Sequence, residues 1–141
     1  MSVELLHPMV VHFPIALLLV SFFCETIALA LKIPSWHRLS FWNLIFGMWG
    51  ALAAVMTGGI ASTMTEHYSF QSYGVQQWHE MTGALAFAMT VIVGSWHLAV
   101  GKQMKPVSRW IAWGLLGLTC LVMTVAAYLG GRLVYEFKVV G

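Results

Sequence analysis

The chain has 141 residues, of which 60% are hydrophobic and only 9% are charged, and it contains no Asp. A soluble domain carries roughly 25% charged residues, so this composition excludes an ordinary water-soluble protein and indicates an integral membrane protein. The length suits one membrane domain over residues 1–141. The first apolar run exceeds the ~7–15-residue core of a signal peptide, and no basic cluster precedes it. We therefore expect Met1 to stay in the mature chain.

Four apolar runs, separated by short polar stretches, follow one another along the chain. Each is long enough to cross a hydrocarbon core that needs ~20 residues of helix. We predict membrane-spanning helices at about 8–31, 39–61, 79–100 and 108–130. No low-complexity segment and no repeat of fixed period is visible. The predicted fold class is all-α, an integral membrane four-helix bundle.

Charged residues divide between the two ends of the predicted bundle. The first and third connectors carry basic residues and no acid, namely Lys32, Arg38, Lys102, Lys105 and Arg109. Cytoplasmic loops of membrane proteins carry such an excess of Lys and Arg. We therefore expect these connectors in the cytoplasm of a bacterial-type inner membrane, with both termini and the second connector on the outer, periplasmic side.

Two histidines lie at the start of the first span, in the stretch from His7 to Pro14. An ionisable group at membrane depth indicates a functional site. His12 and His79 open the first and third predicted spans at the same level, so we expect them to be a ligand pair. The alternative for His12 is a hydrogen bond to a carbonyl that Pro14 leaves free.

His7 lies about 140° around the helix from His12. The two side chains therefore cannot both bind one haem from a straight helix. If Pro8 and Pro14 unwind this turn, His7 joins His12 and His79 around a small metal ion, with Glu66 or Glu80 nearby. Otherwise His7 caps the helix. His67, in the second connector, is expected to be solvated.

The third span presents small residues between two histidines. At about 100° per residue, one narrow face contains His79, Gly83, Ala86, Thr90, Gly94 and His97. Small residues allow close helix packing in a bilayer, or they clear space for a haem held by axial histidines inside a bundle. His97 and His37 are a candidate second ligand pair, although an interfacial, solvated His37 is the simpler interpretation. Similar stripes in the second and fourth spans favour packing.

Glu25 is the one acidic residue that lies more than one turn inside a predicted span, since Glu80 is at the start of the third. An ionised carboxylate at that depth needs a partner, and His97, Arg38 or Arg109 can reach it. The functional interpretation is a proton-handling or structural ion pair. The alternative is a protonated acid that bonds to a neighbouring helix.

Three motifs together resemble a known family. They are Leu6-His7-Pro8 followed by Val11-His12-Phe13-Pro14-Ile15-Ala16-Leu17, a histidine that opens the third span, and Gly130-Gly131-Arg132-Leu133-Val134-Tyr135. They resemble the predicted membrane proteins catalogued as domain of unknown function 2231, over essentially the whole chain. The resemblance implies a four-helix membrane domain, joined in some members to c-type cytochrome modules, and so implies redox surroundings. The family's motif maps onto His7, His12 and His79, whereas the last residues, 136–141, depart from its usual ending.

The favoured function is a membrane-bound b-type haem protein, or the haem-bearing subunit of a respiratory complex. It would pass electrons between a quinol pool and a periplasmic carrier, with one haem b or two. The chain has no CxxCH motif for covalent haem attachment. The alternatives are a His-ligated copper, zinc or iron protein and a cofactor-free structural subunit. No nucleic-acid-binding surface and no nucleophile constellation is visible, so an electron-transfer subunit is favoured over a stand-alone enzyme.

Overall fold

A computed structural model of the protein describes residues 6–64 and 69–139, and these residues form four long helices. The helices are α1 (Leu6–Leu31), α2 (Pro34–Met64), α3 (Phe70–Val100) and α4 (Pro106–Tyr135), with a 3₁₀ turn, η2 (Gly101–Gln103), before α4. All four are long and apolar enough to cross a membrane. The described residues contain no strand, so the predicted all-α membrane bundle is confirmed.

Each predicted span lies inside a helix that is longer at one end or at both. The helices start earlier than predicted because residues that favour helix starts stand in the polar stretches before the apolar runs. Pro106 stands in the first turn of α4, where its missing N–H costs no hydrogen bond. The Ser69 hydroxyl caps α3 by accepting from the Ser72 backbone N–H, 3.2 Å away.

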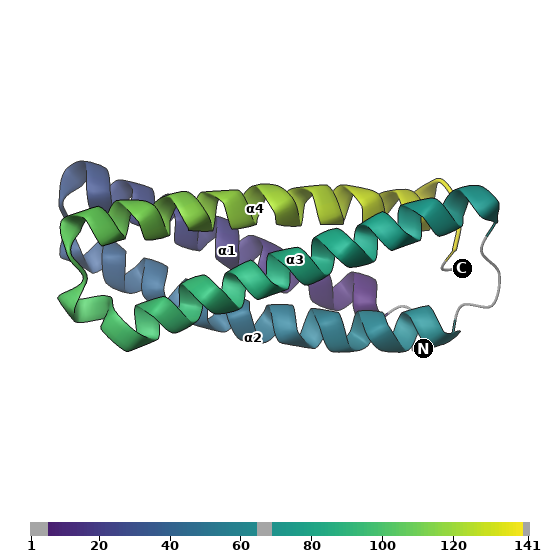
Figure 1. The fold of residues 1–141 in the computed structure, drawn as a ribbon, viewed down its shortest axis with the longest axis horizontal. Helices are drawn as coiled ribbons and strands as arrows, with labels where there is room; N and C mark the ends of the chain where they lie inside the picture. The colour runs from purple at the N-terminus through teal and green to yellow at the C-terminus, as the bar shows by residue number, and fades with distance from the viewer. Residues whose placement is uncertain (1–5, 65–68, 140–141) are drawn as a thin grey trace.

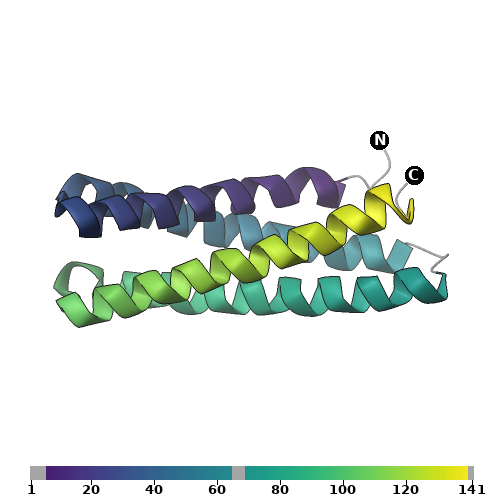
Figure 2. The ribbon, with the colours of Figure 1, turned by 90° about the horizontal axis from the view of Figure 1, so that it is seen from above.

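The helices run alternately up and down, so that consecutive helices are neighbours and α4 closes the bundle against α1 (Figure 1). Helices α1 and α3 are diagonal, as are α2 and α4. In Figure 2, α1 lies above α3, and α4 runs obliquely from the level of α3 at one end of the bundle to near the level of α1 at the other. We call the end where α1 begins and α4 ends the terminal end. The opposite end, where α1 joins α2 and α3 joins α4, is the basic end, since the basic connectors lie there.

The bundle is apolar both inside and outside. Its core consists of Leu18, Leu44, Val93, Leu116 and Cys120. Large apolar side chains also cover the outer surface, as Trp49, 62% exposed, and Leu121, 66% exposed, illustrate. A surface of this kind suits lipid, in which apolar side chains are stable when exposed.

The second hairpin repeats contacts of the first. His79, Ala126 and Gly130 each lie 72 positions after their counterparts His7, Ala54 and Gly58. Pro106 and Leu116 likewise follow Pro34 and Leu44. These equivalent positions relate two helical hairpins at a spacing of 72 residues, although no repeat of fixed period is visible in the sequence. Few residue identities survive at this spacing, which hides it in the sequence.

Candidate functional site

Two histidines meet inside the bundle at the terminal end. His7 lies on α1 and His79 on the diagonal helix α3, and their ring centroids are 6.0 Å apart with an angle of 75° between the planes. Both side chains are half-buried. The backbones of these two diagonal helices do not approach each other closely, so the two rings bridge the interior at this level.

Each of these rings is fixed through Nδ1 by the next helix. His7 Nδ1–H donates to the Ala54 carbonyl oxygen at 2.9 Å, and His79 Nδ1–H donates to the Ala126 carbonyl oxygen at 2.8 Å. A carbonyl oxygen only accepts, so the proton of each neutral ring is on Nδ1 and the lone pair is on Nε2. Neither Nε2 forms a hydrogen bond to any described residue. Both rings thus have the arrangement of a metal-ligating histidine, whose other nitrogen donates to a backbone carbonyl.

Glycines on α2 and α4 provide the space for the rings. A Cβ added at Gly58 would lie 2.9 Å from His7 Cε1, and a Cβ added at Gly130 would lie 2.9 Å from His79 Cε1. No real Cβ approaches another atom that closely, so only glycine permits these ring positions. Gly58 lies in the second predicted span, whose small residues were expected to pack helices, and at this position the small residue also provides space for the site.

The expected partner of His79 was His12, and the structure shows a different pair. His12 is exposed, and its Nδ1 lies 2.6 Å from the carbonyl oxygen of Pro8, one turn earlier in α1. This carbonyl is not the one that Pro14 leaves free. His7 occupies the interior position because α1 stays helical through Pro14 and turns the His7 face inward. A ligand role for His12 remains a prediction.

A second cluster lies inside the basic end. His37 Nδ1–H donates to both carboxyl oxygens of Glu25, at 2.7 and 2.9 Å. The ring of His97 lies 6.2 Å from that of His37, between centroids, with 37° between the planes. His97 Nδ1–H donates to the Val93 carbonyl oxygen at 2.9 Å. The structure therefore brings His37 and His97 together, and their role as a ligand pair stays a prediction.

Glu25 has a partner that its position in the sequence did not indicate. The expected partners were His97, Arg38 or Arg109, whereas the structure shows His37, at the start of α2. Glu25 is only 3% exposed, and His37 is half-buried rather than solvated. The close turn between α1 and α2 brings these two residues together, which their separation of twelve positions in the sequence does not reveal.

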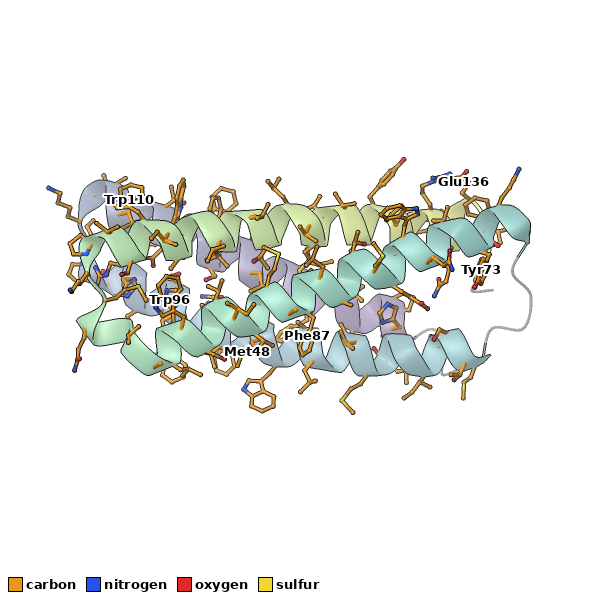
Figure 3. All side chains as sticks on the ribbon, viewed as in Figure 1. Met48, Tyr73, Phe87, Trp96, Trp110 and Glu136 are labelled. Atoms are coloured by element: carbon orange, nitrogen blue, oxygen red, sulfur yellow. The ribbon has the colours of Figure 1, made fainter. Side chains whose placement is uncertain are left out.

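Arg109 completes the polar groups at the basic end. Its Nε is buried and has no hydrogen-bond acceptor among the described residues. Arg109 follows His37 by 72 positions, and His97 follows Glu25 by the same number. The four ionisable residues of this cluster are therefore two pairs of equivalent positions in the two hairpins. Trp96 and Trp110 mark this end in Figure 3, whereas Tyr73 and Glu136 mark the terminal end.

The small face of α3 points into the bundle as predicted, but it has two uses. Ala86, Thr90 and His97 on this face are buried. Near the middle, Gly94 admits Met48 of α2, whose Sδ would be 2.9 Å from an added Cβ. Gly83, one turn after His79, has no such neighbour within 4 Å. The face therefore packs closely at Gly94 and leaves room beside the His7–His79 pair.

The family match comes from the whole chain. A model of the family described as predicted membrane protein (DUF2231) matches residues 4–140. The chain belongs to this family. No curated protein matches it, and no solved structure does.

This DUF2231 protein holds its histidines in pairs. No group of three His, Cys, Asp or Glu side chains that could hold a metal ion occurs within residues 6–64 and 69–139. The expected small metal site with His7, His12, His79 and Glu80 is accordingly not assembled. Glu66 and His67 lie outside the described residues.

Pairs of imidazoles suit a haem better than a bare ion. A zinc site takes three or four protein ligands, whereas haem iron takes its other ligands from the porphyrin and needs axial ones only. Both pairs in this DUF2231 protein bring two imidazole rings together, with centroids 6.0 and 6.2 Å apart, and imidazole is a side chain that haem iron takes from a protein.

Proposed function

We propose that this protein is a membrane-bound b-type haem protein that passes electrons between a quinol pool and a periplasmic carrier, alone or as a subunit of a respiratory complex. The observation that carries the proposal is the state of the four paired histidines. Each has Nδ1 bonded to an acceptor, in His37 a carboxyl group and in the others a backbone carbonyl. This leaves Nε2 of every ring available to a metal.

At the terminal end, His7 and His79 would hold the haem in this proposal. Ala54 and Ala126 orient the two rings through their carbonyl groups. Hydrogen bonding of the distal nitrogen increases the basicity of a ligating imidazole. Gly83 supplies space next to the pair.

At the basic end, His37 and His97 are candidate ligands of a second haem. The carboxyl group of Glu25 orients His37, and the buried position of His97 limits access of water. The two ring pairs are separated by the eighteen positions between His79 and His97, which is about 27 Å along a helix. Two haems at these positions would place redox centres near both membrane surfaces.

The cofactor, when bound, supplies reversible one-electron chemistry, and the protein supplies ligands, orientation and a dry environment. The basic end faces the cytoplasm in this proposal, by the positive-inside tendency. The terminal end then faces the periplasm, where the redox carrier docks.

Absorption spectroscopy tests the proposal. The protein is purified from haem-replete membranes, reduced with dithionite and scanned, and its haem is measured as the pyridine haemochrome. We expect a Soret band and paired visible bands in the wild-type protein. A protein without either signal contradicts the proposal, and metal analysis then separates a metal-ion protein from a cofactor-free subunit.

Ligand variants identify the site. His7→Ala and His79→Ala should each lose the absorption of the terminal-end haem, whereas His12→Ala should keep it because His12 is exposed. A normal spectrum in His79→Ala, or a spectrum lost only in His12→Ala, overturns the assignment. His97→Ala reports separately on the basic end.

A further inference from the structure

A cavity of about 280 Å³ lies at the basic end, between the end of α1 and the starts of α2 and α4. Its size is near the lower limit of the ~300–1,000 Å³ that is usual for small-molecule sites. Its lining includes four ionisable residues, namely Glu25, Lys32, His37 and Arg109. The other lining residues are apolar, and they include Leu29, Ile33, Met104 and Trp110.

Two apolar residues that line this cavity are also exposed on the outer surface of the bundle. Ile33 is 37% exposed and Trp110 is 53% exposed, both next to the cavity. Trp113, which contacts Trp110 edge to face, donates its indole N–H to Thr26 Oγ at 2.9 Å and so ties α4 to α1 beside the cavity. A ligand can therefore enter from the bilayer, with a flat ring against Trp110.

The polar lining residues of the cavity offer both a hydrogen-bond donor and a hydrogen-bond acceptor. Arg109 Nε–H is buried without an acceptor, which is costly unless a ligand provides one. The Glu25 carboxyl group, already bonded to His37, has lone pairs left for a further donor. A ligand with an apolar flat ring and one polar oxygen at its edge satisfies these groups.

We propose that this cavity binds the head group of a quinone or quinol. A quinone oxygen would accept from Arg109, a quinol hydroxyl would donate to Glu25, and the isoprenoid tail would leave past Ile33 and Trp110 into the lipid. The choice of a redox-active ring over other aromatic lipids rests on the proposed function, since His37 lines the cavity and its ring faces His97.

Tryptophan fluorescence tests this proposal on the full chain with any bound cofactor, in nanodiscs of neutral phospholipid, with decylubiquinone as the probe. Because quinones quench indoles on contact, we expect a saturable quenching component that disappears in Trp110→Phe. Trp49→Phe, which removes a lipid-exposed tryptophan of α2, should retain it. Quenching that rises linearly with quinone, or that saturates equally in Trp110→Phe, overturns the proposal.

Two further variants address the polar side and the volume of the cavity. Arg109→Gln should increase the half-saturating quinone concentration at least tenfold, whereas Arg132→Gln at the terminal end should not change it. Ala28→Phe fills the cavity from α1 and should abolish saturation even if Arg109→Gln does not fold. Unchanged binding in Ala28→Phe would exclude the cavity. Loss of saturation when anionic lipid replaces neutral lipid would assign it to a lipid head group instead.

The quinone measurement and the haem spectrum test the two proposals separately. Saturable quenching in a protein without haem supports this site and contradicts the proposed redox function. A normal haem spectrum without saturable quenching supports the redox function and overturns this site.

Discussion

The rings of His7 and His79 meet edge to face, with centroids 6.0 Å apart, although they belong to the two diagonal helices α1 and α3. Their Nδ1 bonds to Ala54 and Ala126 both span 47 positions of sequence. One helical hairpin thus contributes each ring, and each hairpin orients its own histidine through the next helix. The site at the terminal end exists only where the two hairpins come together.

Because the rings lie against particular glycines, we expect alanine substitutions at adjacent glycines to differ in their effect on stability. Gly58→Ala places a Cβ against His7, and overpacking of this kind costs about 1–3 kcal/mol. Gly59→Ala meets nothing within 4 Å, and Ala is favoured over Gly within a helix by roughly 0.5–1 kcal/mol. We expect a lower Tm in detergent, and less bound haem, for Gly58→Ala only.

Gly130 and Gly131 in the second hairpin allow the same comparison of alanine substitutions at adjacent glycines. Gly130→Ala should behave as Gly58→Ala does, since its Cβ would contact the His79 ring, and Gly131→Ala should be neutral or slightly stabilising. Equal Tm values for Gly130→Ala and Gly131→Ala would show that the rings move freely and would contradict the proposed preorganisation.

The hydrogen bond between His37 and Glu25 predicts an order of stability among variants. Glu25→Ala leaves the half-buried Nδ1–H of His37 without its acceptor, which costs about 1–3 kcal/mol. Glu25→Gln keeps one acceptor oxygen and should cost less. Thermal unfolding followed by circular dichroism checks this order.

Glu80→Gln is the matched control for Glu25, because Glu80 is exposed and, among the described residues, bonds to Gln76 on the same helix. Its Tm should equal that of the wild-type protein. A Glu25→Gln variant as unstable as Glu25→Ala would mean that the charge, rather than the hydrogen bond, stabilises this end.

In a bilayer, core side chains stabilise the bundle through packing contacts rather than through removal from water. We therefore expect a smaller loss of stability from a core substitution than in a soluble protein. Leu116→Ala removes contacts from a side chain that is 1% exposed. Leu→Ala in a soluble core costs about 2–5 kcal/mol, and we expect about 2 kcal/mol here because lipid is as apolar as Leu. Leu121→Ala on the lipid-facing side of the same helix should change little. Unfolding in mixed SDS micelles measures the free energy of unfolding of both variants. Equal losses of stability in Leu116→Ala and Leu121→Ala would contradict the assignment of Leu116 to the core and Leu121 to the lipid-facing surface.

The ion pair at the end of α4 predicts a weak dependence of stability on pH. The hydrogen bond from Arg132, at 2.6 Å, holds the pKa of Glu136 below its ordinary value. A carboxyl group with a lowered pKa stabilises the folded state above its unfolded pKa, and this contribution is lost as the pH falls through the folded one. Because Glu136 is exposed, solvent screens the pair. Arg132→Gln should leave the Tm unchanged at pH 7 within error, and a drop of several degrees would contradict this.

Much of the architecture could be predicted because membrane insertion depends on local composition. Four apolar runs of sufficient length imply four spans whatever their neighbours are, and the basic connectors group at one end because alternate connectors share a side. Helix ends were less predictable. The helices continue past their apolar runs where Ser69 caps α3 and Pro106 starts α4.

The sequence by itself determined that His79 and His97 share one inward face of α3, since helical periodicity relates residues of the same element. It also determined that His37 and His97 are at one level. Only the tertiary structure decided that His7, and not His12, faces His79. Helix α1 is apolar on nearly every side, and in lipid no difference in polarity marks its inner face. That face is chosen by packing, through Gly50 against Phe13 and Pro14 and through Gly58 against the ring of His7.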